Sequence, residues 1–108
     1  PEKSWTGLTE HDVAMMEEAQ PLFTELVTLS SKLLSGGSVD EQALAASRAR
    51  AEKITSVSNE SLSENMVKIK EDIVGAFTNI QTYASSQSKE ELWKAQQKLL
   101  NITSILTN

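Results

Sequence analysis

Apolar residues recur three and four positions apart along most of this chain, which is the spacing of one face of an α-helix. No stretch alternates apolar and polar residues with the period of two that a half-buried strand requires. The sequence therefore predicts an all-α protein. The residues of the four apolar stripes are Ala19, Leu22, Leu26, Leu29 and Leu33; Leu44, Ala51, Ile54 and Val57; Leu62, Met66, Ile69, Ile73, Ala76, Ile80 and Tyr83; and Leu92, Ala95, Leu99, Ile102 and Leu106.

Capping residues and glycines divide these stripes into four predicted helices. A Ser or Thr followed three positions later by Asp or Glu marks a helix start, because each side chain accepts a hydrogen bond from the other residue's backbone. Such pairs are Thr9 with Asp12, Ser38 with Glu41, Ser61 with Glu64 and Ser88 with Glu91. Glycine in Ser35–Gly37 suits the left-handed conformation that ends a helix. We expect one domain over residues 1–108, with a leader at 1–8 and helices at about 9–35, 38–57, 61–85 and 88–107.

Pro21 falls inside the first predicted helix. Proline lacks a backbone N–H, and its ring crowds the carbonyl four residues earlier, which here belongs to Glu17. We expect a kink at this position, or a break that leaves a short first segment.

The stretch Ser56–Asn65 is compatible with two architectures. Serine and asparagine side chains compete for the backbone and favour turns, and Asn59 is suited to end the preceding helix. Against a turn, there is no glycine or proline from Ser38 to Val74, and the apolar phase continues through the stretch. We expect a turn, and hence an antiparallel up-down four-helix bundle. The alternative is a long central helix with two flanking helices, which would leave apolar faces open and form a dimer.

Length and composition limit the class of protein. A chain of 108 residues can bury one hydrophobic core, and 39% hydrophobic with 23% charged residues is typical of a globular domain. The net charge of −5 argues against a nucleic-acid partner. No apolar run approaches the roughly 18 residues of a membrane span. The absence of cysteine is compatible with both the cytoplasm and a bacterial periplasm, so the compartment stays open.

The sequence offers no convincing catalytic or metal-binding set. His11 is the only histidine, and it stands between two acidic residues in the first turn of a predicted helix. A di-iron bundle needs two Glu-x-x-His motifs, and a haem bundle needs an inward pair of axial ligands. Glu18 and Glu25 fall off the apolar stripe and are expected to face water. We therefore predict a protein that is not an enzyme and needs no metal or cofactor.

Two groups of residues are candidates for contact with a partner. The densest positive cluster consists of Arg48, Arg50 and Lys53. It is either a solvated face that balances nearby acidic residues or an anion site between helices. Trp93, Leu100 and Ile105 lie beside the last apolar stripe. This second apolar row exceeds what one packing seam needs, so we predict that it contacts a partner.

These observations favour a non-catalytic helical bundle that acts as a protein-interaction or sensory module, as in extracytoplasmic receptors. Its partner would be another protein or a second copy of the chain. An alternative rests on the stretch Ala84–Leu100, ASSQSKEELWKAQQKLL, which resembles segments of phasins. That resemblance implies an amphipathic binder of apolar surfaces such as lipid droplets or polymer granules.

Overall fold

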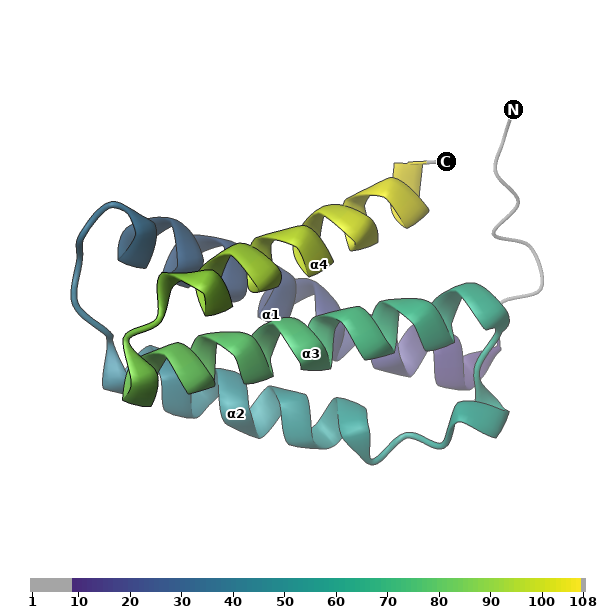
Figure 1. The fold of residues 1–108 in the computed structure, drawn as a ribbon. Helices are drawn as coiled ribbons and strands as arrows, with labels where there is room; N and C mark the ends of the chain where they lie inside the picture. Colours follow the sequence, from purple (N-terminus) through teal and green to yellow (C-terminus); the bar gives the residue numbers. More distant parts are fainter. Residues whose placement is uncertain (1–8, 108) are drawn as a thin grey trace.

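The chain folds into four α-helices in a computed structural model that describes residues 9–107; the predicted leader at residues 1–8 lies outside the described residues. The elements are α1 (Glu10–Leu34), α2 (Glu41–Thr55), a turn of 3₁₀-helix η1 (Asn59–Ser61), α3 (Glu64–Ser86) and α4 (Lys89–Thr107). Consecutive helices run in opposite directions and are joined by short connections (Figure 1). The predicted all-α four-helix architecture is confirmed, and the long central helix is not formed.

The predicted apolar stripes meet in one core between the helices. Leu26 of α1 and Ile73 of α3 are both 0% exposed, as their central places in their stripes predict. The stripe residues that are not fully buried are Val57, Leu62 and Leu106. Two of these lie in the connection between α2 and α3. The third lies in the last turn of α4, where that helix leans away from the bundle (Figure 1).

The first helix begins and ends at the predicted signals. The Thr9 hydroxyl accepts from the Asp12 N–H at 3.0 Å, and the Asp12 carboxylate accepts from the Thr9 N–H at 3.0 Å. At the other end, Gly36 has a φ of +96°, which residues with a side chain rarely adopt. The N–H of Gly37 then donates to the Lys32 carbonyl at 2.8 Å, which satisfies one of the open carbonyls at the helix end.

Of the two outcomes expected at Pro21, a kink or a break, the break is wrong, because α1 is continuous from Glu10 to Leu34. Proline removes one hydrogen bond from the helix. Ala19 and Leu22, on either side of it, are 1% and 0% exposed, so burial in the core holds both neighbouring turns in place.

Both middle helices begin later than predicted, at Glu41 and Glu64. Asp40, rather than Ser38, caps α2, and its carboxylate accepts from two backbone N–H groups of the first turn at 3.1 Å each. A carboxylate is the stronger acceptor and also interacts favourably with the helix dipole. Ser61 belongs to η1, so it cannot cap α3, which begins after Ser63.

The stretch Ser56–Asn65 contains the predicted turn. The α2 helix ends at Thr55, and η1 separates it from α3. Lys70 of α3 stabilises the turn. Its ammonium group donates to the Val57 carbonyl at 2.5 Å and to the side-chain oxygen of Asn59 at 2.8 Å.

Asn59→Pro should therefore be tolerated. Ser58 has φ −69° and ψ 136°, the extended conformation that a residue before proline prefers, and Asn59 is the first residue of η1. We expect the free energy of unfolding to fall by at most about 1 kcal/mol, against about 3 kcal/mol or more for proline inside a helix. Urea unfolding followed by circular dichroism measures this, with Glu52→Pro in α2 as the matched control. A loss equal to that of the control would show that the stretch is helical in solution.

Candidate interaction surface

One flank of α4 is charged and is bonded to α3. Asn79 of α3, 9% exposed, donates to the Glu91 carboxylate at 2.7 Å and accepts from the Lys98 ammonium at 2.5 Å. Lys94 pairs with Glu91 at 3.7 Å. The Lys98 stem passes over Gly75, where a Cβ atom would lie 3.1 Å from it. Polar bonds and close contact thus hold this flank of α4 against α3.

Asp72 lies on the same seam between α3 and α4. Burial, and then the neighbouring carboxylate of Glu71, raise the pKa of Asp72 above its usual value. Lys98 and a hydrogen bond with Asn101 act in the opposite direction without cancelling these effects. Charged side chains of both signs therefore lie at the contact between α3 and α4.

The flank of α4 that faces α1 carries one charge, Lys89 in the first turn, and none beyond it. Leu100 follows Trp93 by seven positions, which places them two turns apart on one side of the helix, about 10 Å along its axis. They are 58% and 64% exposed, the highest values among the large apolar side chains that the structure describes. Gln96 and Thr103 lie on the same side, and α4 has no charged residue from Leu99 to Thr107.

The α1 helix supplies the other half of this surface. Phe23 and Val27 line a shallow pocket of about 170 Å³ together with Leu100 and Thr103 of α4. The Gln96 amide donates to the Ser30 hydroxyl at 3.4 Å, which ties the two helices together. We call this surface the α1/α4 face. It consists of Phe23, Val27, Trp93, Gln96, Leu100 and Thr103.

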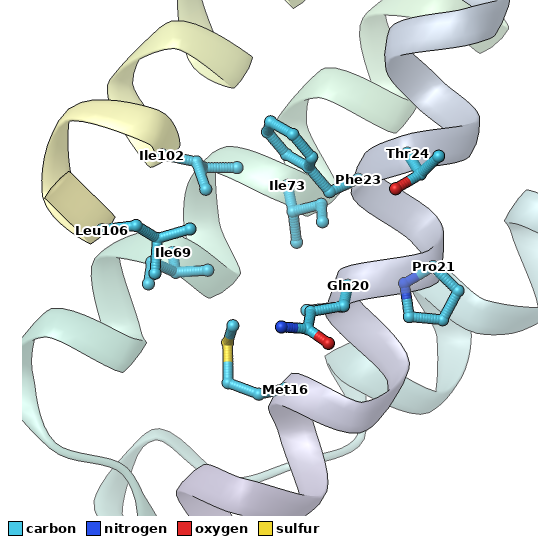
Figure 2. A pocket seen from close by; sticks show the side chains of 10 residues that line it. Met16, Gln20, Pro21, Phe23, Thr24, Ile69, Ile73, Ile102 and Leu106 are labelled. Carbon is cyan, nitrogen blue, oxygen red and sulfur yellow. The ribbon is translucent and has the colours of Figure 1, made fainter. Parts of the chain in front are cut away.

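The α1/α4 face opens into a larger pocket toward the C-terminal end of α4. This pocket has a volume of about 460 Å³ and lies between α1, α3 and α4. Its apolar walls are Met16, Phe23, Ile69, Ile73, Ile102 and Leu106. Figure 2 shows the Met16 side chain and the Gln20 amide pointing into the space, whereas Pro21 points away from it. A pocket of this size and lining accommodates apolar groups.

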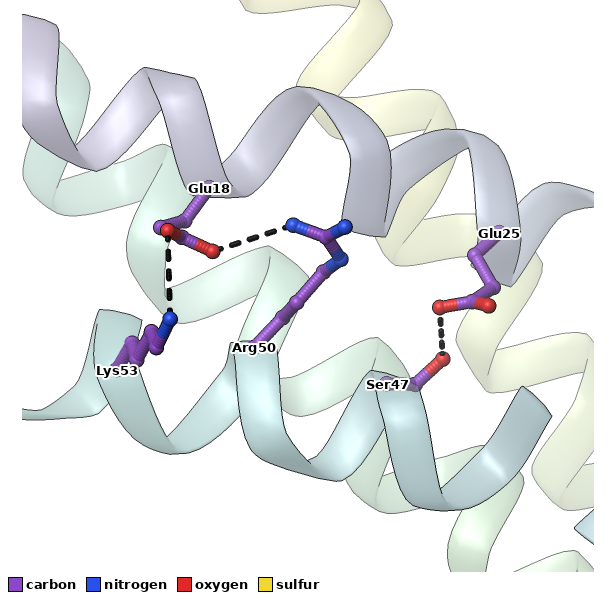
Figure 3. Close-up of polar contacts among 5 residues, drawn as sticks. All are labelled: Glu18, Glu25, Ser47, Arg50 and Lys53. Carbon is purple, nitrogen blue, oxygen red and sulfur yellow. Dashed lines mark hydrogen bonds and ion pairs between the residues drawn. The ribbon is translucent and has the colours of Figure 1, made fainter. Parts of the chain in front are cut away.

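The structure does not bring the predicted cationic cluster together. Arg50 and Lys53 both face Glu18 of α1, with N–O distances of 3.2 and 3.9 Å (Figure 3). Arg48 instead faces α3, where Gln81, with its amide oxygen turned toward α2, accepts from the guanidinium at 3.1 and 3.3 Å. The three cations thus pair with two different helices. Exposed pairs of this kind contribute about 0–1 kcal/mol each.

Two carboxylates of α1 expected to face water are in fact turned toward α2. Glu18 forms the ion pairs just described, and Glu25 accepts from the Ser47 hydroxyl at 2.7 Å (Figure 3). Ser47 is 0% exposed, so its hydrogen bond to Glu25 satisfies a buried hydroxyl. Both carboxylates therefore take part in helix packing.

Of the three predicted apolar contacts, only Trp93 and Leu100 share a surface. Ile105 follows Leu100 by five residues, a rotation of about 140° around the helix. It is partly buried and packs against the core. Sequence reasoning also missed Phe23 and Val27, because helical periodicity does not say which helices are neighbours.

The chain matches no protein-family model, and neither a curated protein nor a solved structure is significantly similar to it. Among residues 9–107, no three acidic or histidine side chains are grouped so that they could hold a metal ion. None of the four helices in that range combines the length and hydrophobicity needed to span a bilayer. The α1/α4 face contains the two most exposed large apolar side chains of residues 9–107, Trp93 and Leu100.

Proposed function

We propose that this domain is a non-catalytic protein-interaction module, and that a helix of a protein partner packs on the α1/α4 face. The proposal depends mainly on Trp93 and Leu100, which are 58% and 64% exposed on a flank of α4 that carries a charge only in its first turn, at Lys89. Large aromatic and aliphatic side chains provide much of the binding free energy at protein interfaces, and charged residues are depleted from interface centres.

The exposed row on α4 is not needed to close the fold. The core-facing residues of α4 are already at most 5% exposed, and they are Leu92, Ala95, Leu99 and Ile102. Trp93 and Leu100 lie outside this set. Burying such a side chain in an interface would contribute about 1.5–3 kcal/mol, a gain that the isolated domain leaves unused.

The composition of the α1/α4 face favours a protein over a lipid droplet or polymer granule. Gln96 and Thr103 lie among the apolar residues of the face. The Thr103 hydroxyl already donates to the Leu99 carbonyl at 3.2 Å, and the Gln96 amide nitrogen donates to Ser30. The amide oxygen of Gln96 needs a donor when it is buried, and a protein surface can supply one whereas hydrocarbon cannot. We therefore rank a protein partner above the phasin-like alternative.

A sensory role would use the same surface. The first turn of α1 and the last turn of α4 lie at the same end of the bundle (Figure 1). A partner that shifted α4 against α1 would therefore move the last turn of α4 relative to the first turn of α1. This geometry supports a module that passes a binding event to flanking segments.

Capture with matched variants tests the proposed function. Leu100→Glu places a charge in the α1/α4 face, and Ala45→Glu places the same charge on the exposed side of α2. With each as bait in a lysate of the cells that make the protein, wild type and Ala45→Glu should retain the same partner. Leu100→Glu should lose it at least about tenfold, the effect of roughly 1.4 kcal/mol. Melting temperatures measured beforehand establish that all three baits are folded.

Two outcomes would contradict the proposal. One is that all three baits retain the same proteins, since the α1/α4 face would then play no part in the capture. The other is that wild type floats with phospholipid-coated triolein droplets in a density gradient while Leu100→Glu stays in the aqueous fraction. That result would assign the face to an apolar surface, as the phasin-like alternative requires.

A further inference from the structure

We infer that the loop end of the bundle holds a binding site for a phosphate group, formed by Ser38, Tyr83 and Lys89. The loop end is the end at which α1 connects to α2 and α3 connects to α4, and Figure 1 shows both connections on the same side of the molecule. None of the three residues belongs to the α1/α4 face, so the site does not depend on the proposed function.

A pocket of about 370 Å³ opens between these two connections. Residues 36–38 of the α1–α2 connection line one part of it. Tyr83 near the end of α3, Gln87 in the α3–α4 connection and Lys89 at the start of α4 line the rest of its polar wall. We call this space the loop-end pocket. It brings polar side chains together from segments that are far apart in the sequence.

The Tyr83 hydroxyl is an unpaired polar group on a mostly buried side chain. Tyr83 is 8% exposed and belongs to the hydrophobic core. Its hydroxyl forms no hydrogen bond within the part of the chain that the structure describes, where no side-chain nitrogen or oxygen is both fully buried and unpaired. The hydroxyl therefore reaches the small surface that Tyr83 exposes, in the wall of the loop-end pocket. A tyrosine hydroxyl on a buried side chain usually has a hydrogen-bond partner, and a ligand in this pocket can provide it.

Lys89 and Ser38 provide further free donors. Among the described residues, the Lys89 ammonium has no ion-pair partner and the Ser38 hydroxyl has no hydrogen-bond partner. Ser38 is available because Asp40 caps α2 in its place. Lys89 is the first residue of the 19-residue helix α4, whose positive dipole end adds to the charge of the side chain. The start of α4 therefore favours an anion.

The acidic residues that follow Ser38 and Lys89 in the sequence do not line the loop-end pocket. The Asp40 carboxylate accepts from two backbone N–H groups of α2, and Glu91 accepts from an amide of α3. Glu41 and Glu90 are exposed at the surface. Lys89 is thus the sole charged side chain among the described residues that line this pocket, which presents a positive charge although the chain as a whole is acidic.

The arrangement of the donors suits a phosphate group better than a carboxylate. Ser38, Tyr83 and Lys89 come from three different segments around the loop-end pocket, so their donors approach from different sides. A phosphate group has a tetrahedral set of oxygens and accepts from several sides at once, whereas the two oxygens of a carboxylate lie in one plane. A phosphate ion fills only part of this volume, which leaves space for the organic group of a small phosphate monoester.

Titration with inorganic phosphate, followed by proton–nitrogen NMR at constant ionic strength, tests the site. The backbone signals of Ser38 and Lys89 should shift, with half-saturation in the millimolar range because the net charge of the chain opposes binding. Lys89→Gln should raise the half-saturating concentration at least about tenfold, and Tyr83→Phe at least about threefold. Tyr83→Phe should leave the melting temperature unchanged, since the hydroxyl has no partner within the described part of the folded chain.

Lys68→Gln is the matched control, because it removes the same charge from an exposed position of α3. It should bind phosphate as wild type does. Equal weakening by Lys68→Gln and Lys89→Gln would overturn the inference, since binding would then follow net charge alone. Wild-type signals that move no more with phosphate than with chloride, or a Tyr83→Phe variant that binds like wild type, would overturn it as well.

A second titration with glycerol 3-phosphate distinguishes two sources of the phosphate group. If the ester binds at least about threefold more tightly than inorganic phosphate, the organic group also contacts the loop-end pocket and the ligand is a phosphate monoester. Equal or weaker binding of the ester assigns the site to inorganic phosphate. Neither probe shifting the signals of Ser38 and Lys89 would mean that the loop-end pocket is not a phosphate site.

Discussion

Leu26→Ala should lower the free energy of unfolding by about 2–5 kcal/mol, and Ile73→Ala should do the same. Both side chains are 0% exposed in the centre of the core, so truncation removes buried apolar surface and leaves a cavity that the packed helices cannot close. A domain of this size has a total stability of about 5–15 kcal/mol, so either change removes a large fraction of it.

Urea unfolding followed by far-ultraviolet circular dichroism measures this loss. The matched control is Val13→Ala, an aliphatic truncation on the same helix at a position that is 49% exposed. The control should change stability by no more than about 0.5 kcal/mol. Equal losses at Val13 and Leu26 would mean that the buried side of α1 is assigned incorrectly.

Asp12→Ala should cost about 2–4 kcal/mol, although Asp12 is a charged residue in the first turn of a helix. Its side chain is 0% exposed. The carboxylate accepts from the Thr9 N–H at 3.0 Å and from the Ser63 N–H at 2.9 Å, so it joins the start of α1 to the start of α3. Alanine would leave both donors without a partner and would remove the cap.

Asp12→Asn provides the control for this prediction, because the amide keeps the size of the side chain but only one of its oxygens. It should retain part of the stability that alanine loses. Urea unfolding of the three proteins at neutral pH gives the comparison. If Asp12→Ala is as stable as wild type, the link between α1 and α3 makes no contribution in solution.

The contribution of Asp12 should also depend on pH. Burial raises the pKa of Asp12, but hydrogen bonds from Thr9 and Ser63 outweigh burial and hold that pKa below its usual value. The folded chain therefore binds this proton less readily than the unfolded chain, whose pKa is about 3.9. The stabilisation is complete above the unfolded-state pKa and is lost as pH falls through the folded-state pKa. The difference between wild type and Asp12→Asn should shrink accordingly below about pH 4.

The core and the first helix were predictable from local pattern, because they depend on residues close together in sequence. The Thr9 and Asp12 capping box spans three residues, and the stripe through Leu26 follows from helical periodicity. The later start of α2 was not predictable in the same way. Ser38 and Asp40 are both good capping residues, and the choice between them depends on how the chain leaves Gly37 to cross from α1.

The contacts between helices were only partly predictable. The exposed pair of Trp93 and Leu100 follows from the second apolar row on the last helix. Whether Glu18 faces water or α2 depends instead on which helix lies beside α1, and periodicity does not contain that information. The same limit applies to Phe23 and Val27, which complete the α1/α4 face only because α4 returns beside α1.

Photo-crosslinking from within the α1/α4 face tests whether this surface is covered by a protein in the cell. A benzoylphenylalanine in place of Trp93 should, on illumination of cells that make the protein, give a discrete product of higher mass that contains a second copy or another protein. The same group in place of the exposed Ala45 on α2 should give none. No product from position 93, or the same products from both positions, would contradict the assignment of the α1/α4 face as the interaction surface.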